Sequence, residues 1–280
     1  MQNMPKQKTH IAQTIKLVTP QQGVSISSND RGFNYGDGFF TTAKIVDAQV
    51  EHWPLHSARL VECAQRLSFG ELDLSALQQA IAEYIKTVSL GVLKIVVTRG
   101  EGGRGYGLPE QSNLLIVLSL LPFPSHYAQL AQQGIKLAIS PVQLASQPLL
   151  AGLKTLNRLE QVMIKRAMQG QDCDDVLVCD YHNNVIETSA ANIFAIKNGR
   201  VFSPSLQNCG IQGVYLQSLC DKLTIEFTDI KLEQLLQMEA VFSCNSLMGI
   251  VPVTAIDGMQ FELANSLVLL HGLFTKESAC

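Results

Sequence analysis

The sequence predicts an α/β (α+β) protein built from two domains. Short apolar segments typical of strands are mixed along the chain with longer segments that show helical spacing. The stretch Leu121-Pro122-Phe123-Pro124 has few helix or strand conformations open to it and is typical of a linker. A length of 280 residues is enough for two moderate domains. We expect a polar tail at 1–13, an N-terminal α/β domain at 14–120, a linker at 121–125 and a C-terminal domain at 126–280.

The N-terminal domain should contain two helices and several strands. Pro54 begins the first helix, in which apolar residues recur at helical intervals up to Gly70, and the second helix spans Leu74–Val88. Two apolar strands follow, separated by a long glycine-rich loop. The strands are expected at Ile15–Val18, Thr42–Val46, Gln49–Trp53, Val92–Thr98 and Asn113–Leu120.

The C-terminal domain should contain two hairpins. Asn198-Gly199 between two apolar runs is a strong signal for a type I′ turn, and His182-Asn183-Asn184 joins a second pair of runs. A short helix should follow the linker, and further helices are expected at Gly213–Leu223 and from about Leu263. The strands are expected at Ile135–Ser140, Val176–Cys179, Val185–Ile186, Ile193–Ile196, Val201–Phe202, Thr224–Ile230 and Ala240–Ser243.

Composition and charge argue against several classes of function. A net charge of −3 and an isoelectric point near 6.1 give no electrostatic footprint for nucleic acid, so small molecules and other protein subunits are the expected partners. The longest apolar runs are too short to cross a bilayer, and the six histidines lack metal-ligand spacing, so we expect a soluble protein without a metal. Seven scattered cysteines without a CxxC pair, and no signal peptide, favour the reducing cytoplasm.

The segment LAGLKTLNRLEQV, residues 150–162, presents one lysine for covalent chemistry. Asn157 can act as an N-cap, and Glu160 stands three residues later in capping-box position, so a helix should begin here. Lys154 then falls in the turn before that helix. A lysine in such a place could bond covalently to an aldehyde cofactor if its surroundings lowered its pKa. On position alone an ordinary loop lysine is the other interpretation.

The loop from Arg99 to Gly107, RGEGGRGYG, contains the pattern GxGxxG after a strand. A dinucleotide site would need a helix next, but Pro109 and another strand follow, so we reject that interpretation. Two alternatives stay open. The loop is either simply flexible, or it is a mobile flap whose Arg104 grips a substrate carboxylate with its bidentate guanidinium.

Two charged residues are candidates for anchoring a cofactor. Arg59 lies on the first predicted helix, where arginines are usually solvated, and it would serve a phosphate only if it faced a cleft between the domains. Glu187 ends a strand beside the small residues Thr188 to Ala191 and could lie under a flat ring. Against pyridoxal phosphate such a glutamate would keep the ring nitrogen protonated. Taken alone, Glu187 could equally face solvent at the end of its strand.

Two turns could complete a phosphate site. Gly210 and Gly213 come directly before a predicted helix, where the free amides of Val214 and Tyr215 suit a phosphate monoester, although a simple glycine turn is the alternative. Near the end of the chain, Asn245 and Ser246 stand at the exit of an apolar strand, where polar residues can finish a site. Each signal is weak alone, but together they supply the parts that a pyridoxal-phosphate enzyme needs.

The order of these motifs resembles the fold-type IV pyridoxal-phosphate enzymes, which include branched-chain and D-amino-acid aminotransferases and aminodeoxychorismate lyases. The resemblance covers nearly the whole chain from about Ile15. It implies a small N-terminal α/β domain and a larger C-terminal cofactor domain with a mixed sheet or pseudobarrel flanked by helices. The matching pieces are NYGDGFFTTAKI, HSARL, TRGEGGRGY, GLKTLNRLEQ, VIETSAANIF, GIQGVYLQ and CNSLMGIVPV.

The resemblance implies a role for each candidate residue. Lys154 would bond to pyridoxal 5'-phosphate and shuttle protons, and Glu187 would pair with the pyridine nitrogen. The phosphate would be bound by Arg59, by the backbone amides of Val214 and Tyr215, and by Ser246. The family also implies a homodimer in which loops of one subunit reach toward the cleft of its neighbour.

Within this superfamily the chain is most similar to the aminodeoxychorismate lyases, because of the threonine pair in NYGDGFFTTAK and the motifs around Lys154 and Asn245. This implies conversion of 4-amino-4-deoxychorismate to 4-aminobenzoate and pyruvate, toward folate. Thr42 would protonate the departing enolpyruvyl group, and Arg104 and Asn245 would hold the carboxylate side of the substrate. A D-amino-acid or branched-chain aminotransferase and a non-catalytic cofactor binder are the alternatives.

Overall fold

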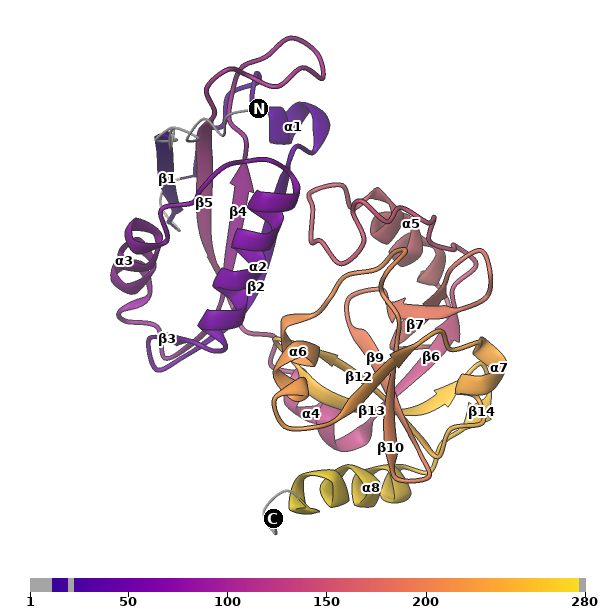
Figure 1. Ribbon diagram of the computed structural model, residues 1–280. Coiled ribbons are helices and arrows are strands. Elements are labelled where there is room, and N and C mark those ends of the chain that lie inside the picture. Colours follow the sequence, from indigo (N-terminus) through magenta and orange to yellow (C-terminus); the bar gives the residue numbers. More distant parts are fainter. Residues whose placement is uncertain (1–11, 20–22, 277–280) are drawn as a thin grey trace, which may run out of the picture. The chain divides into compact units, whose positions relative to one another are not determined.

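The computed structural model describes residues 12–19 and 23–276 (Figure 1). The chain forms two compact units. Unit 1 contains the described residues up to 50, residues 56–121 and residues 155–157, and unit 2 contains residues 51–55, 122–154 and the described residues from 158 onward. Of the tail expected at 1–13, residues 1–11 lie outside the described part, and a strand begins at Ala12.

Unit 1 is built on a five-stranded sheet in the order β1-β5-β4-β2-β3. Strand β1 is parallel to β5, and the other neighbours are antiparallel. Side chains of β4 and β5 are buried along most of their length, which explains why both strands are rich in apolar residues. The strands are β1 (Ala12–Val18), β2 (Gly38–Val46), β3 (Gln49–Val50), β4 (Leu90–Thr98) and β5 (Asn113–Leu121).

Three helices accompany this sheet. Helix α2 (Trp53–Arg66) buries Leu60, Cys63 and Ala64, and α3 (Leu74–Ile85) buries a stripe at spacings of four residues and packs on β1. The short helix α1 (Arg31–Tyr35) was not predicted. The side chain of Asp30 caps α1 by accepting hydrogen bonds from the amides of its first turn.

Unit 2 is built on a closed barrel of six strands, in the order β9-β12-β13-β6-β7-β8 with β8 pairing back to β9. One core cluster takes apolar side chains from all six strands and fills the interior. The next residues along β9 face the other way, where Phe194 stacks on Phe242 at 4.9 Å between ring centroids. The strands are β6 (Ile135–Ile139), β7 (Asp175–Cys179), β8 (Val185–Thr188), β9 (Asn192–Lys197), β12 (Ala240–Asn245) and β13 (Gly249–Ile256).

Other strands and helices surround this barrel. Strands β10 (Arg200–Pro204) and β11 (Ile225–Thr228) extend the sheet beyond β9, and β14 (Met259–Gln260) pairs with β13. Helix α8, yellow in Figure 1, packs on the outer side of β12 and β13. Helix α5 packs on the outer side of β7 through Ile164. The helices are α4 (Tyr127–Gln133), α5 (Leu159–Met168), α6 (Val214–Cys220), α7 (Leu232–Leu235) and α8 (Leu263–Lys276).

The observed elements confirm the expected mixed α/β fold and correct some of its details. The capping box expected at Asn157 is wrong, because α5 begins after Arg158, and the side chain of Asn157 donates to the carbonyl oxygen of Gly36 at 3.1 Å instead. Strand β13 was also missed. Over the described residues, no helix is both long and apolar enough to span a membrane.

Candidate active site

Lys154 lies at the end of a segment that pairs with the loop before α6. The amide of Gly152 donates to the carbonyl of Gly210 at 3.0 Å, and the carbonyl of Gly152 accepts from the amide of Gln212 at 3.1 Å. These bonds form an isolated parallel bridge between Gly152 and Ile211. The half-buried Lys154 follows two residues later, so the ladder fixes the backbone on which it stands.

Glu187 is buried on β8, which excludes the solvent-facing interpretation of this residue. Its carboxylate oxygen Oε2 accepts the amide hydrogen of Ile211 at 2.9 Å, and the side chain of Gln161 donates a further hydrogen bond. Burial raises the pKa of Glu187 to about 7, against the opposing effects of these two donors and of the charges on Lys154 and Arg158. Such a carboxyl would gain from a further cationic partner.

Two cations of unit 2 act on Glu187. Lys154 and Arg158 both favour its ionised form. Burial in turn lowers the pKa of Arg158, while the charges of Glu187 and Glu160 counteract that shift. The structure therefore brings the predicted lysine and the predicted glutamate into one electrostatic cluster, together with an arginine and a glutamine that the sequence did not single out.

The start of α6 is held close to the same cluster. Gly213 is its N-cap, no side chain caps the helix, and the amides of Val214 and Tyr215 belong to its first turn. The side chain of Asn192 donates to the carbonyl of Ile211 at 2.8 Å. A Cβ atom on Gly213 would lie 1.9 Å from Oδ1 of Asn192, so only glycine fits at this N-cap without displacing that side chain.

Asn245 ends β12 and organises the turn that follows it. Its Oδ1 accepts hydrogen bonds from the amides of Leu247 and Met248 at 2.9 and 3.0 Å. Its Nδ2 donates to the carbonyl of Ala190 at 3.3 Å, three residues after Glu187. The half-buried Ser246 lies inside this turn, so the two polar residues predicted at the strand exit stand on a fixed backbone.

Arg59 lies in unit 1 on α2 and is joined to a buried hydrogen-bond chain. Its Nη1 donates to Oγ1 of Thr41 at 3.5 Å, and that oxygen is 2.7 Å from Nδ1 of His56. The Thr41 hydroxyl donates to His56 Nδ1 in one tautomer of the imidazole and accepts from it in the other. Burial lowers the pKa of Arg59 to about 10, so this arginine is not the solvated type that is usual on such helices.

Thr42 and Arg104 also belong to unit 1. The half-buried Thr42 stands on β2 opposite Lys94, and Arg104 is exposed in the loop between β4 and β5. Because β5 follows that loop directly, the structure agrees with the rejection of a dinucleotide fingerprint.

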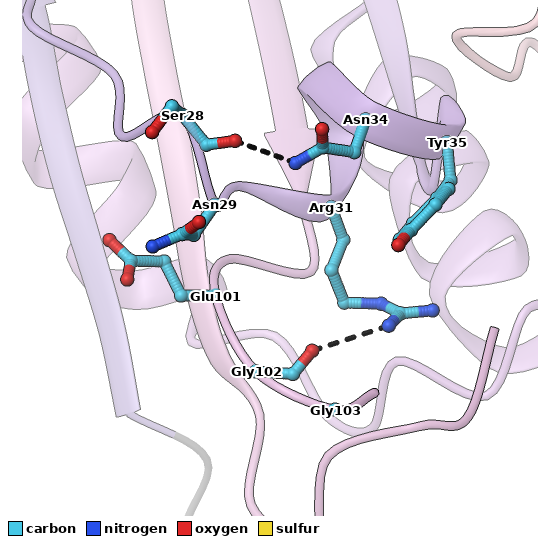
Figure 2. Close-up of a pocket in the computed structure, with 8 residues that line it drawn as sticks. All are labelled: Ser28, Asn29, Arg31, Asn34, Tyr35, Glu101, Gly102 and Gly103. Atoms are coloured by element: carbon cyan, nitrogen blue, oxygen red, sulfur yellow. Dashed lines mark hydrogen bonds between the residues drawn. The ribbon is translucent and has the colours of Figure 1, made fainter. Parts of the chain in front are cut away.

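A pocket of about 550 Å³ opens beside this loop (Figure 2). It lies where α1 and the residues before it face the start of the loop, and its walls are mostly polar. The pocket is lined by Ser28, Asn29, Arg31, Asn34, Tyr35, Glu101, Gly102 and Gly103.

Three residues that support the predicted side chains carry no signal in the sequence. Arg158 and Gln161 reach Glu187 through tertiary packing, and neither has a motif that marks it. Arg31 is a buried arginine in unit 1, and the loop carbonyl groups to which it donates stand about seventy residues further along the chain. Only a structure places such residues beside their partners.

Comparison with known proteins gives consistent matches. The chain matches the family described as amino-transferase class IV over residues 38–256. It is 38% identical to the aminodeoxychorismate lyase of Vibrio harveyi, over 87% of this chain and 91% of that protein. It is 27% identical to the D-alanine aminotransferase of Bacillus licheniformis, over 84% of each chain.

Solved structures agree with these matches. The 4-amino-4-deoxychorismate lyase of Pseudomonas aeruginosa superposes with a TM-score of 0.83 at 35% identity, covering 90% of this chain and 95% of that one. The branched-chain amino acid aminotransferase of Escherichia coli reaches a TM-score of 0.78 at 19% identity, covering 90% of each chain, which shows a shared fold.

Proposed function

Because the chain belongs to the class IV aminotransferase family, we propose that it is a pyridoxal-phosphate-dependent lyase that converts 4-amino-4-deoxychorismate to 4-aminobenzoate and pyruvate, a step toward folate. The observation that carries the choice of reaction is the identity to the lyase of Vibrio harveyi, which clearly exceeds the identity to the D-alanine aminotransferases. The likeness to the Pseudomonas aeruginosa lyase supports the same choice.

The residues present fit the cofactor. When bound, pyridoxal phosphate supplies an aldehyde that bonds to amines and a protonated ring that takes up electrons. Glu187 is a buried carboxyl with a raised pKa, and a protonated ring nitrogen is the kind of partner that would return it to its ionised form. The phosphate contacts that we propose are Arg59, the amides of Val214 and Tyr215 at the uncapped start of α6, and Ser246.

Lys154 and Thr42 move the protons of the proposed reaction. Lys154 Nζ would hold the cofactor through its aldehyde and would take the proton from the substrate carbon that bears the nitrogen. Glu187 would keep the ring nitrogen protonated during this transfer. The bond between the ring carbon and the enolpyruvyl oxygen would break, and Thr42 Oγ1 would give a proton to the enolpyruvyl methylene carbon, so that this group leaves as pyruvate. The proton that Lys154 removes balances the one that Thr42 gives, and aromatisation of the product drives the step forward.

Arg104 and Asn245 bind the carboxylate side of the substrate in this proposal. An exposed guanidinium on a glycine-rich loop can meet a carboxylate with two parallel hydrogen bonds. Asn245 already uses Oδ1 for two backbone amides and one Nδ2 hydrogen for Ala190. It therefore has one N–H left for the substrate, and it also fixes the turn that carries Ser246.

A direct assay tests the function. Purified protein supplemented with pyridoxal phosphate should release 4-aminobenzoate and pyruvate in equal amounts from 4-amino-4-deoxychorismate, measured by fluorescence and by coupling pyruvate to lactate dehydrogenase. Absence of both products from a protein that binds the cofactor would contradict the proposal.

A D-amino-acid or branched-chain aminotransferase is the second candidate, because several related curated proteins are D-alanine aminotransferases. It would use the same lysine. Incubation with D-alanine and 2-oxoglutarate separates the two functions, since sustained formation of glutamate at a rate above that of 4-aminobenzoate release would favour the aminotransferase.

Replacing Gly213 by alanine should weaken cofactor binding. The backbone of Gly213 suits alanine, but the new Cβ would collide with Asn192 Oδ1 and break the bond from Asn192 to Ile211, the residue whose amide holds Glu187. We expect about a tenfold rise in the dissociation constant of pyridoxal phosphate, measured by titration of the apoprotein, and a loss of about 1–3 kcal/mol in stability. Gly272→Ala, with open space around the new methyl group, should change neither property.

We also propose a homodimer in the cytoplasm. Helix α5 and the loop before it expose Leu149, Leu159, Val162 and Met163, an apolar surface that a second subunit would cover. Sedimentation velocity tests this assembly. The six cysteines of the described residues are free thiols, which fits a reducing compartment.

A further inference from the structure

Arg31 lies under the glycine-rich loop that carries Arg104. It is 4% exposed, and its Nη1 lies 3.2, 3.1 and 3.0 Å from the carbonyl oxygens of Gly102, Gly105 and Gly107. Figure 2 shows the guanidinium pointing at the carbonyl of Gly102, at the edge of the pocket. The backbone amide of Arg31 also donates to the carbonyl of Gly100 at 2.8 Å, so one residue holds the loop at both of its ends.

The loop can converge on Arg31 because of the glycine at position 103. Gly103 has a φ of +74°, and a Cβ atom there would lie 2.2 Å from the carbonyl oxygen of Gly107 and 3.0 Å from Arg31 Nη1. A side chain at 103 would therefore push the carbonyl groups away from the guanidinium. Gly105 also has a positive φ, but a Cβ atom there would meet nothing within 4 Å.

The carboxylate of Asp37 links the guanidinium of Arg31 to a second arginine, Arg99. Oδ2 of Asp37 accepts from Nε of Arg31 and from Nε of Arg99, each at 2.8 Å. Burial would raise the pKa of Asp37, but the hydrogen bonds from the two arginines outweigh it and hold that pKa below its usual value. Arg99 is anchored in turn by the carbonyls of Leu67 and Ser68. The guanidinium of Arg31 is therefore fixed by hydrogen bonds inside unit 1.

We propose that Arg31 is a positioning residue for the substrate carboxylate, and that it acts by holding the loop in the conformation that presents Arg104. Its donors are directed at Asp37 and at the loop carbonyls, so it is not placed to bind substrate itself. The loop also contacts α1 through the rings of Tyr106 and Tyr35, which lie 5.4 Å apart between centroids, and the pocket borders the loop at Glu101, Gly102 and Gly103. A bidentate contact loses most of its strength when the guanidinium is displaced, so loop order controls substrate affinity.

The proposal rests on the lyase function and on the role given to Arg104. Its test has two independent readouts. Arg31→Lys keeps the charge but loses the fork that reaches several carbonyls. We expect amide hydrogen exchange in residues 101–107 of the apoprotein to accelerate at least tenfold, with KM for aminodeoxychorismate raised about tenfold and kcat reduced less than threefold. The affinity for pyridoxal phosphate should not change. Arg66→Lys, an exposed arginine on α2, should leave exchange and KM as in the wild type.

A double variant shows whether Arg31 works through Arg104. Arg104→Gln should raise KM by itself, and adding Arg31→Lys should raise it little further, because both changes remove one interaction. Effects on KM that multiply, or unchanged exchange in the loop, would overturn the proposal. A wild-type protein without lyase activity would contradict the proposed function. The hydrogen-exchange measurement would still decide whether Arg31 holds the loop.

Two glycine variants test the same contact if Arg31→Lys does not fold. Gly103→Ala and Gly105→Ala both place alanine at a positive φ, so they share that backbone cost. Only Gly103→Ala drives a methyl group against Gly107 and Arg31. It should reproduce the faster exchange and the raised KM, and Gly105→Ala should change both clearly less. Equal effects of the two variants would show that strain, rather than the contact with Arg31, sets the loop.

Discussion

Lys154→Ala should reduce release of 4-aminobenzoate by about 10⁴-fold or more, because the same amine is proposed to bond to the cofactor and to carry the proton. Purified wild-type protein reduced with borohydride in the presence of pyridoxal phosphate should gain the mass of the cofactor on the peptide that contains Lys154. The variant should gain no such mass there. These two measurements separate covalent attachment from turnover.

The structure makes Lys154 a suitable position because its backbone is fixed by the bonds between Gly152 and residues 210–212, and because its charge acts on Glu187. Lys165→Ala is the matched control. Lys165 stands on the exposed side of α5 and pairs with Asp175, so its loss should leave activity within about twofold. An active Lys154→Ala enzyme, or labelling of another lysine, would remove Lys154 from the mechanism.

The strands and helices that the sequence predicted well are those whose local pattern agrees with their burial. The hairpin of β9 and β10 around Asn198-Gly199 is one example, because the two strands pair as the turn predicts. Helix α3 is another, because its apolar residues at helical spacing are the buried ones. Helix α1 has only five residues and depends on the side chain of Asp30, so it has no periodicity to detect. Strand β13 contains Pro252, a residue that argues against a strand, and it exists because β12 and β6 pair with it on both sides.

The candidate site was predictable only in part for the same reason. The order of motifs identified the family, and the comparisons confirm it. A glutamate at a strand end is usually exposed, and Glu187 is buried because the loop at Ile211 and the side chain of Gln161 close over it. Capping chemistry predicted a helix start at Asn157, but that side chain instead contacts Gly36, which lies far away in the sequence. The roles of the individual side chains stay predictions.

Glu187→Gln should produce the second large effect, a fall in kcat of about 10²–10³-fold, the range seen when one preorganised electrostatic partner of a transition state is lost. Glutamine can still accept the amide hydrogen of Ile211, so the loop should keep its position. What disappears is the negative charge proposed to keep the ring nitrogen protonated. Glu187→Asp keeps the charge but shortens the side chain, so it should retain more activity than glutamine. Equal activity of the two variants would argue that charge is not what matters at this position.

The same substitution has a measurable signature in the apoprotein. The pKa of Glu187 rises from 4.5 to about 7 on folding, so between these two pH values the folded protein binds a proton that the unfolded chain does not. The free energy of unfolding should therefore fall as pH rises through this window, by up to about 3 kcal/mol, and level off above pH 7. Urea denaturation of the apoprotein between pH 5 and 8 should show this slope for the wild type and a flatter profile for Glu187→Gln. Saturating pyridoxal phosphate should also flatten it, because a cationic ring nitrogen beside Glu187 lowers that pKa again. A slope that survives the substitution would assign the proton to another group and leave the carboxyl without the electrostatic property on which its proposed role depends.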